Sequence, residues 1–305
     1  MIEPTLNYVT CPGAAVHGGS EHRMAYWEWN QTGNPWHPHV IVCVHGLTRQ
    51  GRDFDVLART LSQHARVICP DIAGRGYSDW LAQPMDYGLV QYTADMLVLL
   101  HHVNATAPVQ VLDWVGTSMG GLIGLMVCGQ PGLPLPVAVN KLLLNDVGPV
   151  LEWPALQRIA SYVGKPAHFD TEQQAAAALQ VLSAGFGPHT TQAWLALSRP
   201  MLRAVQGGGY RLHYDPAIAL PMQGMTQEQS ERGQAVLWGL YDAIRAQTLL
   251  VRGAQSDLVT QDTARKMQER GPFAQCIELE SVGHAPTFVA DDQVAIARNF
   301  LLGDE

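Results

Sequence analysis

The sequence has few charged residues and no dense cluster of one sign. Of its 305 residues, 15% are charged, and the formal net charge is −8 at pH 7. An acidic chain without a run of Lys and Arg is poorly suited to the phosphates of a nucleic acid or to an anionic membrane surface. We therefore expect neither a nucleic acid nor a membrane as a partner, whereas the sequence leaves the oligomeric state open.

Cysteines are also few, and their spacing fits neither a disulfide framework nor a zinc site. The chain has no C-x-x-C pair and no neighbouring histidine cluster, and three of the five cysteines fall in apolar runs. Such thiols are more often free and buried than bonded or metal-bound. We expect no metal at Cys11, Cys43, Cys69, Cys128 and Cys276.

Long apolar runs are absent. No stretch of 18 apolar residues occurs, and residues 1–4 lack the basic and apolar segments of a secretion signal. These features favour a cytoplasmic protein. Hydrophobic residues nevertheless make up 47% of the chain, which is ample for a large core.

Short apolar segments alternate with segments of helical spacing. Continuous apolar runs are typical of strands buried on both faces of a parallel sheet. Their alternation with helices predicts a parallel α/β sheet. An alternating segment at 24–29 predicts an antiparallel strand at its edge. The predicted buried strands lie near 40–44, 66–69, 109–115, 141–146, 248–253 and 276–279, and helices near 89–102, 260–269 and 291–302.

Between residues 148 and 240 the composition shifts to Ala, Gln, Trp and Met with helical spacing. Because strand patterns resume afterwards, we predict a helical cap at 148–240 inserted into a core of 1–147 and 241–305; a separate helical domain is the alternative. Four large side chains of the cap are candidates to line an apolar pocket: Trp153, Trp194, Trp238 and Met201. Alternatively, they pack the cap onto the sheet.

One strand runs directly into a G-x-S-x-G motif, with Ser118 between Gly116 and Gly120, and then into an apolar helix. A serine on a sharp strand-to-helix turn needs neighbours without side chains, because strand and helix approach closely there. The free N–H groups at the helix start favour a developing oxyanion. The pattern predicts Ser118 as a nucleophile and the Met119 N–H as an oxyanion donor.

A serine nucleophile requires a base, and the base requires an acid to orient it. Of the twelve histidines, only His284 follows Asp257, and it lies just past a predicted strand. We predict His284 as the base and Asp257 as the acid. Asp146, at the end of the preceding strand, is the alternative acid, although it could equally be a turn residue before Gly148.

Other loops at the ends of strands add to the predicted site. The backbone N–H of Leu47, after His45-Gly46, is the expected second oxyanion donor, and His45 is expected to hold its loop by hydrogen bonds. Arg49 and Arg52 could meet a substrate carboxylate or could lie on the surface.

Taken together, these motifs resemble the α/β-hydrolase fold over nearly the whole chain. The resemblance implies a mostly parallel eight-stranded sheet flanked by helices, a Ser118, Asp257 and His284 triad, and no cofactor. The motifs that carry it are His45-Gly46, Asp71-x-x-Gly74-x-Gly76-x-Ser78, Gly116-Thr117-Ser118-Met119-Gly120-Gly121, Asp257 and Gly283-His284.

The resemblance narrows the chemistry to acyl transfer from a small molecule. Serine at the turn disfavours the dehalogenases and epoxide hydrolases, which use aspartate, and His45-Gly46 is not followed by the Gly-Pro-Gly of many carbon–carbon bond hydrolases. The expected activity is hydrolysis of a small or medium carboxylic ester, thioester or lactone. The alternatives are a carbon–carbon bond hydrolase, an acyltransferase, or a slow-turnover ligand receptor.

Overall fold

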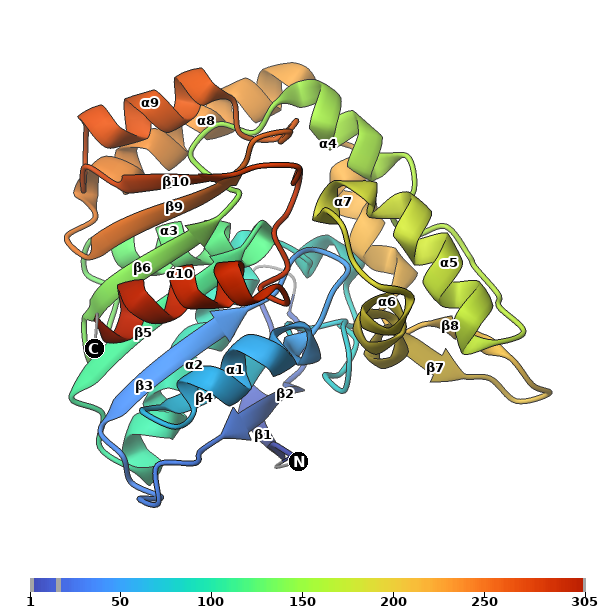
Figure 1. The fold of residues 1–305 in the computed structure, drawn as a ribbon, viewed down its shortest axis with the longest axis horizontal. Coiled ribbons are helices and arrows are strands. Elements are labelled where there is room, and N and C mark those ends of the chain that lie inside the picture. The colour runs from blue at the N-terminus through green and yellow to red at the C-terminus, as the bar shows by residue number, and fades with distance from the viewer. Residues whose placement is uncertain (1–2, 15–17, 304–305) are drawn as a thin grey trace.

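An eight-stranded sheet forms the centre of the computed structural model, which describes residues 3–14 and 18–303 (Figure 1). Strand β2 is antiparallel to β1 and β4, and all other neighbouring strands are parallel. The predicted mostly parallel eight-stranded sheet is therefore confirmed. In spatial order the strands are β1 (Thr5–Cys11), β2 (His22–Trp29), β4 (Arg66–Pro70), β3 (His39–Val44), β5 (Val111–Thr117), β6 (Val139–Asn145), β9 (Gln247–Gly253) and β10 (Gln275–Leu279).

Helices cover both faces of the sheet, which explains why its central strands read as continuous apolar runs. On β3, Val42 packs into one hydrophobic core while the adjacent Ile41 packs into the other. The first core is closed by α2 (Leu89–Thr106), α3 (Met119–Gly129), α8 (Gln227–Ala243) and α9 (Gln261–Glu269), and the second by α1 (Asp55–Leu61) and α10 (Asp291–Leu302).

The segment between β6 and β9 extends beyond the carboxyl ends of the strands (Figure 1). It also contains a hairpin that the sequence patterns did not predict, with its turn at residues 207–209. The elements of this segment are α4 (Trp153–Ala160), α5 (Glu172–Leu182), α6 (Thr191–Ser198), β7 (Leu202–Ala204), β8 (Tyr210–Leu212) and α7 (Leu220–Gln223), followed by α8.

Helix α8 crosses the predicted end of the insertion at residue 240. A Cβ built on Gly129 of α3 would lie 2.2 Å from the Leu240 carbonyl oxygen, so the end of α8 packs directly on α3. The helical spacing of the sequence is continuous along α8, so it does not show where the helix leaves the insertion and begins to pack on α3. Part of α8 therefore belongs to the layer that flanks the sheet.

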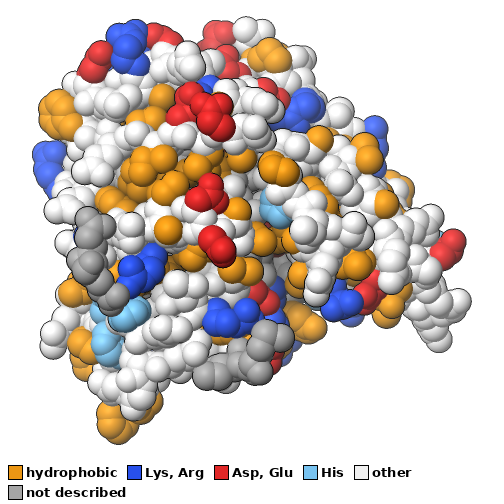
Figure 2. All heavy atoms as spheres, viewed as in Figure 1, with side chains coloured by type: hydrophobic (Ala, Val, Ile, Leu, Met, Phe, Trp, Pro, Cys, Tyr) orange, Lys and Arg blue, Asp and Glu red, His pale blue; other side chains and the backbone are white. Residues whose placement is uncertain are grey.

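The surface is of mixed charge. On the face drawn in Figure 2, Lys and Arg side chains lie scattered among Asp and Glu and form no continuous basic patch. Within the described residues, no helix is both long and apolar enough to span a bilayer.

Candidate active site

Ser118 stands on a strained turn between β5 and α3. Its backbone has φ 52° and ψ −117°, a conformation that L-residues rarely adopt. A Cβ on Gly116 would lie 2.4 Å from the Gly120 carbonyl oxygen, and one on Gly120 would lie 2.0 Å from the Val44 carbonyl oxygen. Only glycine fits at both positions, as the G-x-S-x-G pattern predicted.

The side chains of Ser118, His284 and Asp146 form a chain of hydrogen bonds. His284 Nε2 lies 2.9 Å from Ser118 Oγ, and His284 Nδ1 lies 2.7 Å from Asp146 Oδ2. With Nδ1–H donating to the carboxylate, Nε2 is free to accept the serine proton. This tautomer suits a base that activates a hydroxyl nucleophile.

Asp146 follows β6 directly, and hydrogen bonds hold both its backbone and its side chain. Its backbone has φ 51°, and its N–H donates to the Val251 carbonyl at 2.8 Å. The carboxylate accepts from the Gly253 N–H at 3.0 Å and from the Ser256 hydroxyl at 2.7 Å, in addition to His284. The side chain is completely buried, so these donors replace water around the charge.

Asp257, the predicted acid, does not contact His284. It forms a two-point ion pair with Arg158 of α4, at 2.7 and 2.8 Å, and is about half exposed. The loop after β9 turns Ser256 inward, where its hydroxyl meets Asp146 and accepts the N–H groups of Leu258 and Val259. That turn leaves Asp257 pointing outward, which corrects the sequence-based placement.

The two predicted oxyanion donors flank Ser118. Met119 begins α3, and Leu47 follows Gly46, whose built Cβ would lie 3.6 Å from Ser118 Cβ. Among the described residues, no protein acceptor takes the N–H of Leu47 or Met119. Arg75, which the sequence reasoning did not select, is completely buried beneath them: its Nε donates to the Leu47 carbonyl at 2.8 Å, and its Nη2 lies 3.6 Å from Met119 Sδ.

His45 has the structural role that the sequence predicted. Its Nδ1 lies 2.7 Å from the Gly46 carbonyl oxygen, and the Ile72 N–H donates to Nε2 at 3.0 Å. Burial lowers the pKa of His45 to about 3, so the ring is neutral. The ring therefore ties the Leu47 loop to the loop after β4.

Two cavities meet at Ser118. The first, of about 110 Å³, contains His284 and is named here the His284 cavity; the second, of about 270 Å³, contains Met119 and is named the Met119 cavity. Of the four cap residues proposed for the pocket, only Met201 lines either one. Trp194 instead stacks on Phe186 inside the insertion, with ring centroids 6.0 Å apart.

The two cavities differ in chemistry. Apart from Ser118, the Met119 cavity is lined by apolar residues, glycine and two tyrosines, including Leu122, Val147 and Leu258. The His284 cavity has two arginines, Arg49 and Arg158, as well as hydroxyl groups. Arg52, the other arginine considered for a substrate, pairs with Asp55 and lies over Trp27 instead.

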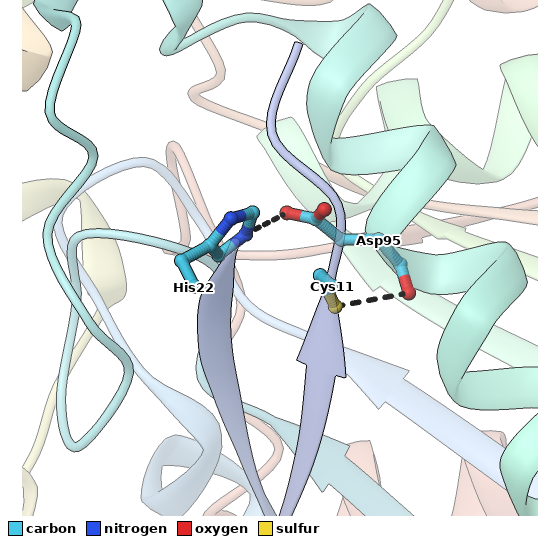
Figure 3. Close-up of side chains that lie close together, drawn as sticks. All are labelled: Cys11, His22 and Asp95. Carbon is cyan, nitrogen blue, oxygen red and sulfur yellow. Dashed lines mark hydrogen bonds and ion pairs between the residues drawn. The ribbon is translucent and has the colours of Figure 1, made fainter. Parts of the chain in front are cut away.

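Among the described residues, one group of side chains could hold a metal ion: Cys11, His22 and Asp95 (Figure 3). None of the three lines either cavity. His22 Nε2 lies 3.0 Å from Asp95 Oδ2, and the Cys11 thiol lies 3.9 Å from the Asp95 carbonyl oxygen. Burial raises the pKa of the Cys11 thiol, which favours its neutral, non-ligating form. These two contacts join β1 and β2 to α2.

Sequence and structure comparisons agree with this fold. The family described as "alpha/beta hydrolase fold" matches residues 39–291, and the chain belongs to this family of hydrolases. A 3-hydroxybutyrate-oligomer hydrolase of Cupriavidus necator is 47% identical over 98% of both chains.

Two solved structures extend the comparison to the full chain. A protein of Rickettsia typhi is 26% identical, with a TM-score of 0.85 and coverage of 99% of this chain and 100% of that one. An α/β hydrolase of Novosphingobium aromaticivorans is 31% identical, with a TM-score of 0.82 and complete coverage of both chains. The insertion between β6 and β9 is thus part of the shared architecture.

Proposed function

We propose that this hydrolase cleaves short oligoesters of hydroxyalkanoic acids through a serine acyl-enzyme. The observation that carries the proposal is the hydrogen-bond chain from Ser118 through His284 to the buried Asp146. The substrate class rests on the similarity to the 3-hydroxybutyrate-oligomer hydrolase, which extends over 98% of both chains. The paired cavities support it, since an ester has two sides to accommodate.

In the proposed mechanism, Ser118 Oγ attacks the ester carbonyl carbon and its proton passes to His284 Nε2. The negative oxygen of the tetrahedral intermediate accepts from the Leu47 and Met119 N–H groups, each worth about 3 kcal/mol in the transition state. The bond to the leaving oxygen then breaks, and His284 gives that oxygen the proton. Water then gives a proton to His284 and attacks the acyl carbon; as the bond to Ser118 Oγ breaks, His284 returns the proton to that oxygen and the acid is released. Asp146 holds the imidazole tautomer and stabilises the imidazolium.

Initial rates of hydrolysis of p-nitrophenyl butyrate and of the 3-hydroxybutyrate dimer test the mechanism. Ser118→Ala and His284→Ala are expected to lose at least about 10⁴-fold in kcat, because nucleophile and base act as one unit. Asp146→Asn should lose about 10³- to 10⁴-fold, because an amide favours the wrong imidazole tautomer. Asp257→Asn should lose less than about tenfold on p-nitrophenyl butyrate, since its carboxylate contacts Arg158 and not His284.

The paired aspartate variants separate the two candidate acids. A large loss in Asp257→Asn with little loss in Asp146→Asn would reverse the assignment. Ester turnover without cleavage of the dimer would leave the mechanism standing and remove the oligoester substrate. Incubation with a competing alcohol distinguishes hydrolysis from acyl transfer, because a transferase gives the new ester as its main product.

A further inference from the structure

The position of His284 determines which cavity receives which half of the ester. In the proposed mechanism the leaving oxygen must reach His284 Nε2 to collect its proton. His284 lines only one of the two cavities that meet at Ser118. The alcohol half therefore faces the His284 cavity, and the acyl half enters the apolar Met119 cavity.

The alcohol side of the site is lined by arginines and not by carboxylates. Arg49 and Arg158 line the His284 cavity, and no Asp or Glu among the described residues does so. Asp53 and Asp257 pair with the two arginines from outside this lining. Arg49 and Arg158 are therefore the arginines on the side of the site that the leaving alcohol would face.

Arg49 is close to the nucleophile and rigidly held. A Cβ built on Gly46 would lie 3.6 Å from Ser118 Cβ and 3.9 Å from Arg49 Cγ, so the arginine side chain starts beside the reacting centre. Its Nε and Nη2 donate to Asp53, each at 2.6 Å, and Nη2 also donates to the Leu197 carbonyl at 3.0 Å. Its Nη1 donates to no described residue and remains available.

Arg158 approaches the same cavity from α4. Asp257 holds its Nε and Nη2 at 2.7 and 2.8 Å, so the carboxylate that sequence reasoning assigned to His284 instead orients this guanidinium. Arg158 is much more exposed than Arg49. The two arginines thus occupy an inner and an outer position along the His284 cavity.

From these observations, and resting on the proposed function, we infer that Arg49 and Arg158 bind the free carboxylate at the leaving end of the substrate. In a 3-hydroxyacid ester, two carbons separate the leaving oxygen from the next carboxyl carbon, so the carboxylate lies roughly 4–5 Å from that oxygen. A guanidinium binds a carboxylate through charge-assisted hydrogen bonds. The enzyme is then an exo-hydrolase that removes the carboxyl-terminal hydroxyacid.

The test compares two substrates that differ only in charge. The 3-hydroxybutyrate dimer is offered with its terminal carboxylate free or converted to a primary amide, and cleavage of the internal ester is followed by chromatography. Wild-type kcat/KM is expected to favour the acid by about 10- to 100-fold, the range for a hydrogen bond to a charged group. Raising the salt concentration should reduce this preference.

Variants assign the preference to the arginines. Arg158→Gln should lower the acid-to-amide ratio severalfold, and Arg49→Gln should bring it near one. Because Arg49→Gln alone leaves Asp53 without its partner, a second variant carries Asp53→Asn as well, so that both charges of the pair are removed together. Arg232→Gln, which breaks an exposed pair on α8, is the matched control and should keep the wild-type ratio.

Equal kcat/KM for acid and amide in the wild-type enzyme would overturn the inference while leaving the proposed function intact. Failure to cleave either dimer would remove the proposed substrate. The carboxylate site is then judged by inhibition of p-nitrophenyl butyrate hydrolysis: tighter inhibition by the acid dimer, lost on removal of Arg49, supports it. Equal inhibition by the two dimers contradicts it.

Discussion

At the residue scale, the buried His45 makes stability depend on pH. Its pKa of about 3 lies below the ordinary value of about 6.5, because burial opposes the charged ring. The unfolded chain therefore binds the proton more readily, and stability is lost as the pH falls below 6.5. From pH 7.5 to 5.0 this one group should cost about 2 kcal/mol of unfolding free energy.

Urea unfolding at the two pH values checks the expectation. His45→Gln removes the titrating group, so the variant is expected to be less stable at pH 7.5 and to lose about 2 kcal/mol less on acidification. The exposed His64, replaced by Gln, is the control, and its variant should follow the wild-type pH dependence. Parallel pH curves for wild type and His45→Gln would show that the ring has the same pKa in the folded and unfolded chain, and would contradict the expectation.

Also at this scale, the sequence predicted which residues are chemically special better than it predicted their partners. The glycines around Ser118 identify the turn, because crowding there excludes every other residue. Asp146 and Asp257 both follow strands that end at the same edge of the sheet, so strand order alone cannot show which of them meets His284. The inward turn of Ser256 decides between them, and that turn depends on contacts with Asp146 itself.

At the element scale, α3 packs on α8 with no room for a side chain at Gly129. Gly129→Ala would place a methyl group 2.2 Å from the Leu240 carbonyl oxygen, so the helices must separate, at a cost of about 1–3 kcal/mol. Gly239→Ala, one residue before Leu240 in α8, meets no atom within 4 Å and should gain up to about 1 kcal/mol from helix propensity. Thermal unfolding of both variants measures this difference.

Comparing Gly129→Ala with Gly239→Ala is informative because the two substitutions are chemically identical. Destabilisation of both would point to a shared backbone effect rather than to the α3–α8 contact. The sequence identified α3 and the insertion by composition and period, but not this contact, since spacing along one helix carries no information on its neighbour. It also missed β7 and β8, because these paired strands have three residues each and an alternating pattern is recognisable only over four or more.

At the scale of the whole molecule, the insertion is bound to the loops that build the active site. The Gly283 N–H, beside His284, donates to the Gly185 carbonyl at 2.6 Å. On the other side, the Asp215 N–H donates to the Gly74 carbonyl at 2.7 Å. The insertion therefore holds the loops around Ser118 as well as enclosing the His284 cavity.

The buried pair of Tyr87 and Asp215 offers a measurement of this coupling. The tyrosine hydroxyl donates to Asp215 Oδ2 at 2.6 Å, and burial raises the pKa of Tyr87, so it remains a donor at every working pH. Tyr87→Phe, Asp215→Ala and the double variant should give a coupling energy of about 1–3 kcal/mol in unfolding free energy. The exposed Glu228 and Arg232 pair on α8 is the control, with an expected coupling below about 0.5 kcal/mol.

Activity decides what that coupling means for catalysis. If the insertion holds the loop of Arg75, and through Arg75 the carbonyl of Leu47, loosening Asp215 should lower kcat for p-nitrophenyl butyrate together with stability. Loss of stability with unchanged kcat would show that the insertion only covers the site. If the coupling energy of Tyr87 and Asp215 is no larger than that of the surface pair, other contacts hold the insertion on the core. The hydrogen bond between Gly283 and Gly185 is then the next to be tested.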